Sequence, residues 1–180
     1  MTVLEKVKSA VMPTETEEAR SQARTKARAA AAPGSWLGMV IGHHEKIENA
    51  FAEVKAARDA AGRTQAQKRL AVLLTGHSIA EESVLYPALA ATDQKGHAAT
   101  AYMQQSEAKT EMAALEKLAP MSHDYLEKLE QIHMAVAHHV FEEEGTWFPV
   151  LLKKASAADQ AMLAKRYTEE YERYVDGKAD

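Results

Sequence analysis

The 180-residue chain contains no cysteine, which excludes disulfides, thiolate zinc sites, iron–sulfur clusters and cysteine nucleophiles. Glycine, proline and aromatic residues are also sparse, and the runs of β-branched and aromatic residues that strands favour are missing. Alanine, the best helix former, dominates the hydrophobic residues instead. The composition therefore predicts an all-α protein, and the length suffices for one domain with a sizeable core.

Long apolar runs and an excess of basic residues are absent as well. No run approaches the roughly 18 consecutive apolar residues of a membrane span, and Glu5, Lys6 and Lys8 lie where a signal peptide would be apolar. The formal net charge is −4, and the basic residues between positions 20 and 28 follow acidic ones, in the order that a helix dipole favours. We therefore expect a soluble, cytoplasmic protein that binds neither nucleic acid nor a membrane.

Turn and cap signals divide the chain into helices. Pro33 stops one helix and Ser35 is a candidate N-cap for the next, while Gly62 and Pro120 each end a later helix, with Ser122 as another candidate N-cap. After a short amphipathic segment over residues 1–12, the expected helices cover about 15–31, 36–61, 65–91, 97–119, 123–155 and 157–175.

Short connections between the four longest helices make them antiparallel neighbours. The predicted fold is therefore an up-down-up-down four-helix bundle with extra N-terminal and C-terminal helices. In this division, residues 1–34 form an N-terminal helical extension, 35–155 form the bundle, and 156–180 form a C-terminal helix and tail.

Polar residues interrupt the apolar stripe that each long helix should turn toward the core. They are His44, His77, Glu81, His139 and Glu143. Three imidazoles and two carboxylates in a core are costly unless something compensates them, and a bound cation is the simplest compensation. The His77–Glu81 and His139–Glu143 pairs also lie one helical turn apart on one face, which suits ligation of one ion or of neighbouring ions.

Adjacent histidines require a choice at two of these positions. His43 precedes His44, and His138 precedes His139, and only one of each pair can lie centrally on the stripe. The apolar period favours His44 and His139. The other two histidines would then support the ligands or face solvent.

The two His-x-x-x-Glu pairs belong to an internal repeat. Segments 77–87 and 139–149 both read His-x-x-x-Glu-Glu-x-x-x-aromatic-Pro. We interpret them as two related helix pairs that share one metal site about a pseudo-twofold axis, with the proline kinking or ending each helix at the same height. Three acidic residues lie one position off the stripe and are expected to face solvent, namely Glu82, Glu142 and Glu144.

These motifs, together with the His-His-Glu sequence at 43–45, resemble the hemerythrin-like family, also called the HHE cation-binding domain, over about residues 36–152. The resemblance implies a four-helix bundle around two non-haem irons with an oxo or hydroxo bridge. It makes the three stripe histidines terminal ligands and the two stripe glutamates the carboxylates that span both irons. Nitrogen and oxygen ligands without thiolate suit iron or manganese, with zinc as a substitute.

The helix expected over 97–119 departs from the family pattern, which usually places one or two histidines there. It has none between Tyr102 and its end, and Ala108 occupies the expected stripe position. Glu107 and Glu111 flank that alanine, and Gln104 lies a further turn back. Either glutamate would replace the missing histidine, or both would be solvated, in which case a single metal or an open coordination position follows.

The resemblance favours a protein that binds or senses oxygen, nitric oxide or a related small oxidant. The alternatives are a di-iron enzyme that acts on peroxide or oxygen, an iron storage or delivery protein, and a helical interaction protein. The expected partner is a small diatomic ligand or peroxide, and a sensor would in addition signal through its terminal helices to an unidentified protein partner or a second copy. Tyr167, Tyr171 and Tyr174 recur at helical spacing in the last helix and are interpreted as packing residues.

Overall fold

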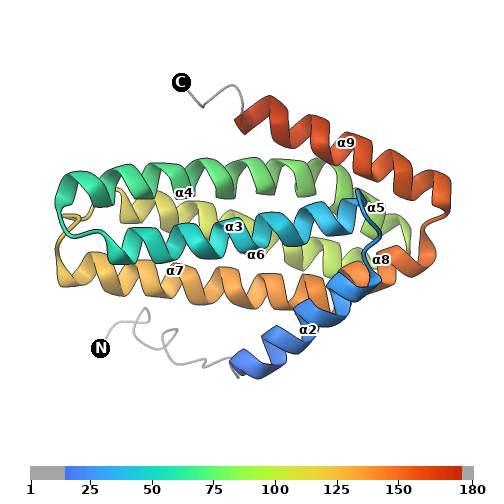
Figure 1. The fold of residues 1–180 in the computed structure, drawn as a ribbon, viewed down its shortest axis with the longest axis horizontal. Coiled ribbons are helices and arrows are strands. Elements are labelled where there is room, and N and C mark those ends of the chain that lie inside the picture. The colour runs from blue at the N-terminus through green and yellow to red at the C-terminus, as the bar shows by residue number, and fades with distance from the viewer. Residues whose placement is uncertain (1–14, 176–180) are drawn as a thin grey trace.

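A computed structural model describes residues 15–175, and within this range it contains helices and no strand (Figure 1). The all-α prediction is therefore confirmed, while the segment predicted over residues 1–12 lies outside the described residues. None of the helices in this range combines the length and apolar character that crossing a membrane requires. In chain order the elements are α2 Glu17–Ala30, α3 Trp36–Ala56, α4 Ala60–Ala80, η1 Glu81–Leu85, α5 Tyr86–Ala91, α6 Lys95–Leu115, α7 His123–Glu142, η2 Glu143–Trp147, α8 Phe148–Lys154 and α9 Ala157–Val175.

The four long helices α3, α4, α6 and α7 lie side by side along the longest axis of the molecule (Figure 1). The two flanking helices attach to the same half of this bundle. Helix α9 packs along α4 and α3, and α2 packs against η2, α3 and α7 on another side. The bundle is thus covered at one half of its length by both flanking helices, and this is the half that contains the polar residues of the repeat.

The predicted caps explain most helix boundaries. Ser35 and Ser122 each accept a hydrogen bond at 3.2 Å from a backbone N–H in the first turn of the helix that follows. The helix expected to run to residue 61 ends earlier, at Ala56, because Asp59 is the N-cap of the next helix and its Oδ1 accepts from the Gly62 N–H at 2.7 Å. Gly62 therefore lies in the first turn of α4 and does not end α3.

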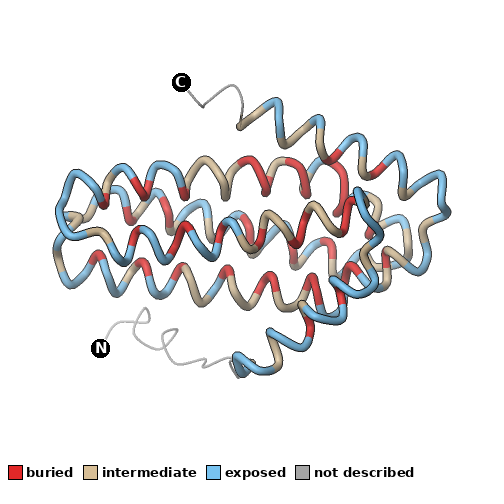
Figure 2. The backbone as a smooth tube through the Cα atoms, in the orientation of Figure 1, coloured by how far each residue is buried: buried red, intermediate tan, exposed pale blue. Residues whose placement is uncertain are grey.

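Two apolar clusters lie on either side of a buried polar layer, and Figure 2 shows the buried stripes of the long helices turned toward one another. One cluster includes Ile41 and Trp147 and lies where α2 and α9 attach, and the other includes Ile47 and Phe51. On α3 the polar layer falls at His44, between the two clusters. Each large buried apolar side chain contributes about 1.5–3 kcal/mol, so the clusters provide the stability that the polar layer does not.

Each copy of the repeat passes through a π-helical turn that ends two residues before its proline. The turns cover Glu81–Leu85 and Glu143–Trp147, and in each the next residue, Tyr86 or Phe148, donates its backbone N–H to the glutamate carbonyl five positions earlier. Proline lacks an N–H and clashes with the carbonyl four residues before it, and the wider turn accommodates it. The distortion expected at one height in both repeats is present, although the chain remains helical through it. The turn also brings Tyr86 back over Glu81.

Candidate metal centre

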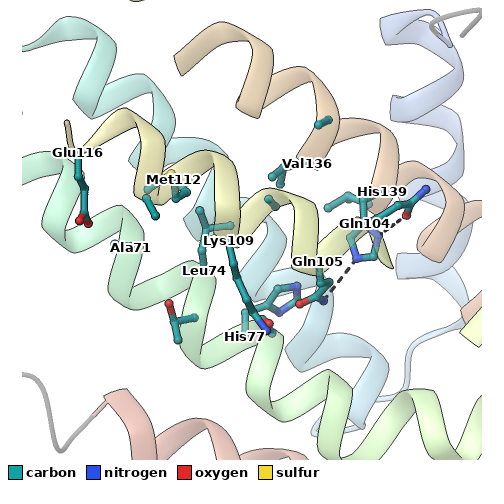
Figure 3. A pocket seen from close by; sticks show the side chains of 16 residues that line it. Ala71, Leu74, His77, Gln104, Gln105, Lys109, Met112, Glu116, Val136 and His139 are labelled. Atoms are coloured by element: carbon teal, nitrogen blue, oxygen red, sulfur yellow. Dashed lines mark hydrogen bonds between the residues drawn. The ribbon is translucent and has the colours of Figure 1, made fainter. Parts of the chain in front are cut away.

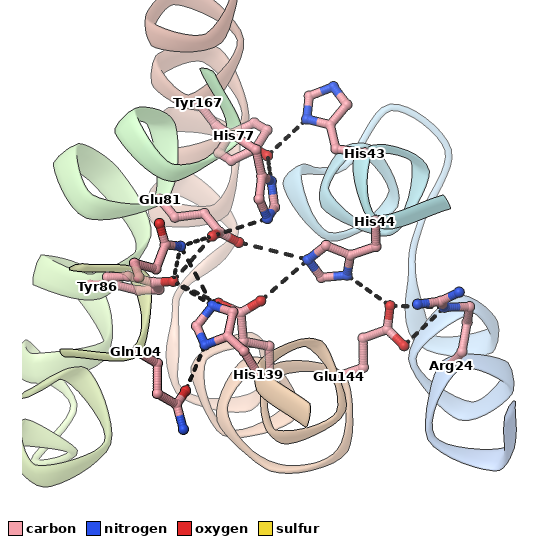
Figure 4. A network of polar contacts seen from close by, with 12 residues as sticks. Arg24, His43, His44, His77, Glu81, Tyr86, Gln104, His139, Glu144 and Tyr167 are labelled. Carbon is pink, nitrogen blue, oxygen red and sulfur yellow. Dashed lines mark hydrogen bonds and ion pairs between the residues drawn. The ribbon is translucent and has the colours of Figure 1, made fainter. Parts of the chain in front are cut away.

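The five polar residues on the apolar stripes meet in the interior of the bundle (Figure 4). His44 comes from α3, His77 from α4 and His139 from α7, while Glu81 and Glu143 each begin a π turn. All five are buried, and the two glutamates have no exposed surface at all. Residues far apart in the sequence thus form one compact cluster of imidazoles and carboxylates.

The two carboxylates lie between the histidines. Oε2 of Glu143 is 3.2 Å from Nε2 of His44, and its Oε1 is 3.2 Å from Nε2 of His139. Oε2 of Glu81 is 3.1 Å from Nε2 of His77, and its Oε1 is 3.9 Å from Nε2 of His44. Each glutamate therefore lies between two histidines and turns one oxygen toward each of them.

The hydrogen bonds around the cluster leave its central atoms without donors. Nδ1 of His44 lies 2.8 Å from a carboxylate oxygen of Glu144, and Nδ1 of His139 lies 2.7 Å from Oε1 of Gln104. In a neutral imidazole the nitrogen facing an acceptor carries the proton, so Nε2 presents a lone pair to the carboxylates. Within the described residues, four converging buried atoms lack any hydrogen-bond partner: His44 Nε2, His77 Nε2, Glu81 Oε1 and Glu143 Oε2.

The four residues that carry these atoms each offer one ligand atom, and these ligand atoms all lie within 4.8 Å of one another. Buried polar atoms normally find a partner, and an isolated failure has many explanations. Here lone pairs of nitrogen and oxygen point at a common centre, and a cation satisfies all of them together. The donor set therefore fits a metal.

The ionisation of the cluster agrees with this assignment. Burial and the neighbouring Glu143 carboxylate raise the pKa of Glu81 to about 7. Burial would also raise the pKa of Glu143, but His139 and His44 hold it below its usual range. Burial would lower the pKa of His44, but the neighbouring Glu143 and Glu144 carboxylates raise it well above its usual value. Without a cation the cluster has to hold protons, so metal must displace them and acid opposes metal binding.

Helix α6 contributes amides to the centre, and the expectation of a carboxylate from it is corrected. Glu107 is exposed, and Glu111 is turned away toward Lys128, whose Nζ lies 2.6 Å from it. The side chains that reach the cluster are Gln104 and Gln105, one helical turn before the Ala108 position. The Gln105 amide donates to Oε2 of Glu81 at 2.6 Å.

Glu144 was expected to face solvent, and it is instead buried against the centre. Besides contacting His44, its two carboxylate oxygens accept from Nε of Arg24 at 3.0 and 3.1 Å. Arg24 belongs to α2, which covers this side of the bundle and excludes water from Glu144. The other two acids of this group, Glu82 and Glu142, stay partly exposed, as expected.

Helix α9 reaches the centre from the opposite side through Tyr167. Its buried hydroxyl lies 3.1 Å from Nδ1 of His77 and 2.9 Å from Nδ1 of His43 (Figure 4). The interpretation of Tyr167 as a packing residue is therefore incomplete, because its hydroxyl also orients one of the cluster histidines. His43 lies outside the cluster and supports it through this tyrosine.

A second hydroxyl, that of Tyr86, contacts the cluster directly. Tyr86 is fully buried, and its hydroxyl lies 2.9 Å from Oε1 of Glu143, 3.1 Å from Oε2 of Glu81 and 3.1 Å from Nε2 of His139. The motif contains an aromatic residue at this position in both repeats, but the counterpart is Phe148, which has no hydroxyl. The sequence motif was defined by the aromatic ring alone, so the role of the Tyr86 hydroxyl was not predicted.

A cavity of about 190 Å³ lies beside the cluster, between α4, α6 and α7 (Figure 3). His77, His139 and Gln105 form part of its wall nearest the cluster, and mainly small or apolar residues form the rest. Ala108, which stands where the family places a histidine, is one of the lining residues and leaves this space open.

Comparison with known proteins agrees with this geometry. The chain is 26 % identical over 124 residues to a protein of Nostoc sp. (strain PCC 7120 / SAG 25.82 / UTEX 2576) named DNA nickase, and the match covers 69 % of this chain but 35 % of that protein. No solved structure matches significantly. The family model "Hemerythrin HHE cation binding domain" matches residues 37–151, which include the whole cluster. By this match, which spans more than half of its length, the chain belongs to the hemerythrin HHE cation-binding domain family.

Proposed function

We propose that this protein holds two non-haem irons in the buried cluster of an up-down-up-down four-helix bundle and uses them to bind a small oxidant such as oxygen or nitric oxide. The observation that carries the proposal is the convergence of four buried, unpartnered donor atoms on one centre. The set contains only imidazole nitrogen and carboxylate oxygen, which suits iron.

The geometry suggests how the ligands divide between two irons. His44 and His77 would serve one position and His139 the other, while Glu81 and Glu143 would offer an oxygen to each. When bound, such a centre supplies exchangeable coordination positions and electrons for reaction with oxygen-derived ligands. The residues of the chain hold it in place, orient its imidazoles and exclude bulk water from it.

The cavity beside the cluster supports a small ligand. Its volume of about 190 Å³ is below the roughly 300–1,000 Å³ of pockets for drug-sized molecules. Its apolar walls suit an uncharged diatomic molecule, and the Gln105 side chain forms part of the wall nearest the centre. The cavity and the centre together favour a ligand of two or three heavy atoms.

The terminal helices support a sensing role. The other ring nitrogen of His44 is held through Glu144 and Arg24 of α2, and that of His77 through Tyr167 of α9. A shift of either imidazole on ligand binding would displace α2 or α9. A partner protein or a second copy bound to that helix could respond to the displacement. The burial of every ligand argues against iron storage or delivery, since cargo needs access.

The second candidate is a peroxide-consuming enzyme. The observation that favours it is a pair of polar groups in contact, the Gln105 amide in the wall of the cavity and the Tyr86 hydroxyl of the centre. Such groups can bind a peroxide oxygen and move a proton. Catalytic turnover of peroxide, as opposed to reversible binding of oxygen or nitric oxide, would decide for this alternative.

The name of the Nostoc relative raises nucleic acid binding, which we do not propose for this chain. The chain spans about a third of that protein, and its own net charge is −4. The arginines of α2 are engaged by carboxylates, Arg24 by Glu144 and Arg28 by Glu45. A basic surface able to replace counterions on DNA is therefore not evident in α2, and we expect no shift of duplex DNA in a gel at physiological salt.

The test is the metal content per chain after expression with iron, with absorption spectra in air and after reduction. We expect two irons per chain and near-ultraviolet charge-transfer bands that bleach on reduction, followed by a reversible optical change with oxygen or nitric oxide. One iron per chain would reject the two-iron arrangement. Iron-free protein that resists reconstitution would reject the proposal as a whole.

A further inference from the structure

We propose that Tyr86 is itself a metal ligand, and that its phenolate oxygen binds the iron on the His139 side of the centre. This inference rests on the proposed function, because it requires that iron. On binding, an iron–oxygen bond forms and the phenol proton passes to solvent, with no change in oxidation state. The assignment comes from four features of the tyrosine's surroundings.

The first feature is distance. The Tyr86 oxygen lies 2.9 Å from Oε1 of Glu143, 3.1 Å from Oε2 of Glu81 and 3.1 Å from Nε2 of His139. Metal–ligand bonds of about 2.0–2.2 Å place neighbouring ligand atoms on one ion about 3 Å apart. The four atoms of Tyr86, Glu143, Glu81 and His139 therefore have the mutual spacing of a ligand set as well as that of hydrogen-bonded groups.

The second feature is a shortage of protons. Nδ1 of His139 donates to Gln104, so its Nε2 is an acceptor, as are the two carboxylate oxygens. The Gln105 amide donates to the Glu81 oxygen, and the single Tyr86 hydroxyl proton cannot satisfy both His139 and Glu143. A cation among the four atoms satisfies all of them at once, including the phenolate that remains when the proton leaves.

The third feature is the Gln105 amide, whose nitrogen donates both to Glu81 and to the Tyr86 oxygen. An amide nitrogen has two protons, and both are directed at oxygens of the centre. The Tyr86 oxygen is thus a hydrogen-bond acceptor from α6. This donor favours an anionic oxygen, and it comes from the helix that lacks the expected histidine. Burial and the Glu143 and Glu81 carboxylates raise the pKa of Tyr86, so the phenolate requires the bound cation.

The fourth feature is the difference between the repeats. Phe148 occupies the matching position after the second π turn and is equally buried, so neither the turn nor the packing needs a hydroxyl. The hydroxyl occurs only in the first copy of the repeat, where it contacts Gln105 of α6, the helix that lacks the expected histidine. A phenolate is a hard, anionic oxygen donor that suits ferric iron.

The experiment is visible absorption and resonance Raman spectroscopy of the ferric, iron-loaded full chain. We expect a visible phenolate-to-iron charge-transfer band in the wild-type protein, with tyrosine ring vibrations enhanced by excitation in that band. Tyr86→Phe should abolish both signals and, because it copies Phe148, should keep the fold. The matched control is Tyr102→Phe, whose ring packs 5.1 Å from that of Tyr86 but whose hydroxyl donates to the backbone oxygen of Glu82.

The outcomes separate this inference from the proposed function. Failure of the wild-type chain to bind iron rejects both. Iron-loaded wild-type protein without enhanced tyrosine vibrations rejects the Tyr86 ligand and leaves the two-iron proposal intact, and this readout needs no variant. A phenolate band that persists in Tyr86→Phe also rejects it, since another tyrosine must then be the ligand.

Discussion

The hydroxyl of Tyr167 is the contact of α9 with the metal centre, and Tyr167→Phe removes that hydroxyl alone. It lies 3.1 Å from Nδ1 of His77 and is completely buried. Loss of the partner of a buried polar atom lowers the free energy of unfolding by about 1–3 kcal/mol. Loss of the group that orients a ligating histidine lowers metal affinity by about 10–100-fold, which corresponds to about 1.4–2.8 kcal/mol of binding free energy. We therefore expect the variant to fold but to hold iron more weakly.

The assay is competition against a chelator of known affinity, together with the midpoint of thermal unfolding with and without metal. Tyr167→Phe should narrow the gap between the two midpoints, because the metal stabilises the folded state in proportion to its affinity. Tyr174→Phe, a partly buried tyrosine on the same helix, is the matched control and should leave the gap unchanged. Equal metal affinity in Tyr167→Phe and wild type, with only a lower metal-free stability, would refute the claim that α9 orients His77.

The other predictions concern the ligand set. His139→Ala should lower iron content and remove most of the metal-dependent stabilisation, as measured by metal analysis and thermal unfolding. Glu107→Ala and Glu111→Ala should leave the iron-to-protein ratio and the spectrum intact. A lower iron content in either variant would show that α6 does supply a carboxylate ligand. Glu144→Gln should lower the iron affinity measured by chelator competition about tenfold or more. Glu82→Gln, its counterpart in the first repeat, should leave that affinity unchanged. Equal effects of the two substitutions would show that the contact with α2 does not matter to the centre.

The cluster was predictable because a buried charge is conspicuous in an apolar pattern. His44 on α3 and the His77–Glu81 pair each fall where periodicity demands an apolar residue, and the repeat marks the pair twice. Local spacing alone places such residues on one helix face. Burial then follows once the apolar stripes pack together.

Helix α6 was not predictable in the same way. Its apolar stripe is weak, because alanine and glutamine give little contrast between its faces. The face of α6 that points at the centre was therefore predicted from the expected histidine position at Ala108. The polar residues that face the centre in the structure lie one turn earlier. Gln105 has the same sequence appearance as any solvated glutamine, and only its contact with Glu81 distinguishes it.

The burial of Glu144 and the role of Tyr167 depend on contacts between distant parts of the chain. Glu144 lies one position off its stripe, which on an isolated bundle helix would leave it partly exposed. It is buried because α2 crosses there and presents Arg24, 120 residues earlier in the sequence. No local pattern records that crossing, whereas the prolines after both π turns did mark where the helices are distorted.

The asymmetry of the centre arises from these flanking elements and not from the repeat. The second acid of each repeat is a glutamate, but Glu144 is buried under α2 while Glu82 pairs with Lys109 at the surface. The outer ring nitrogens of the three histidines also have different partners: Glu144 at His44, Tyr167 at His77 and Gln104 at His139. His77 and His139 both line the cavity beside Ala108. The two irons of the proposed centre would therefore be inequivalent, because a different element holds each imidazole.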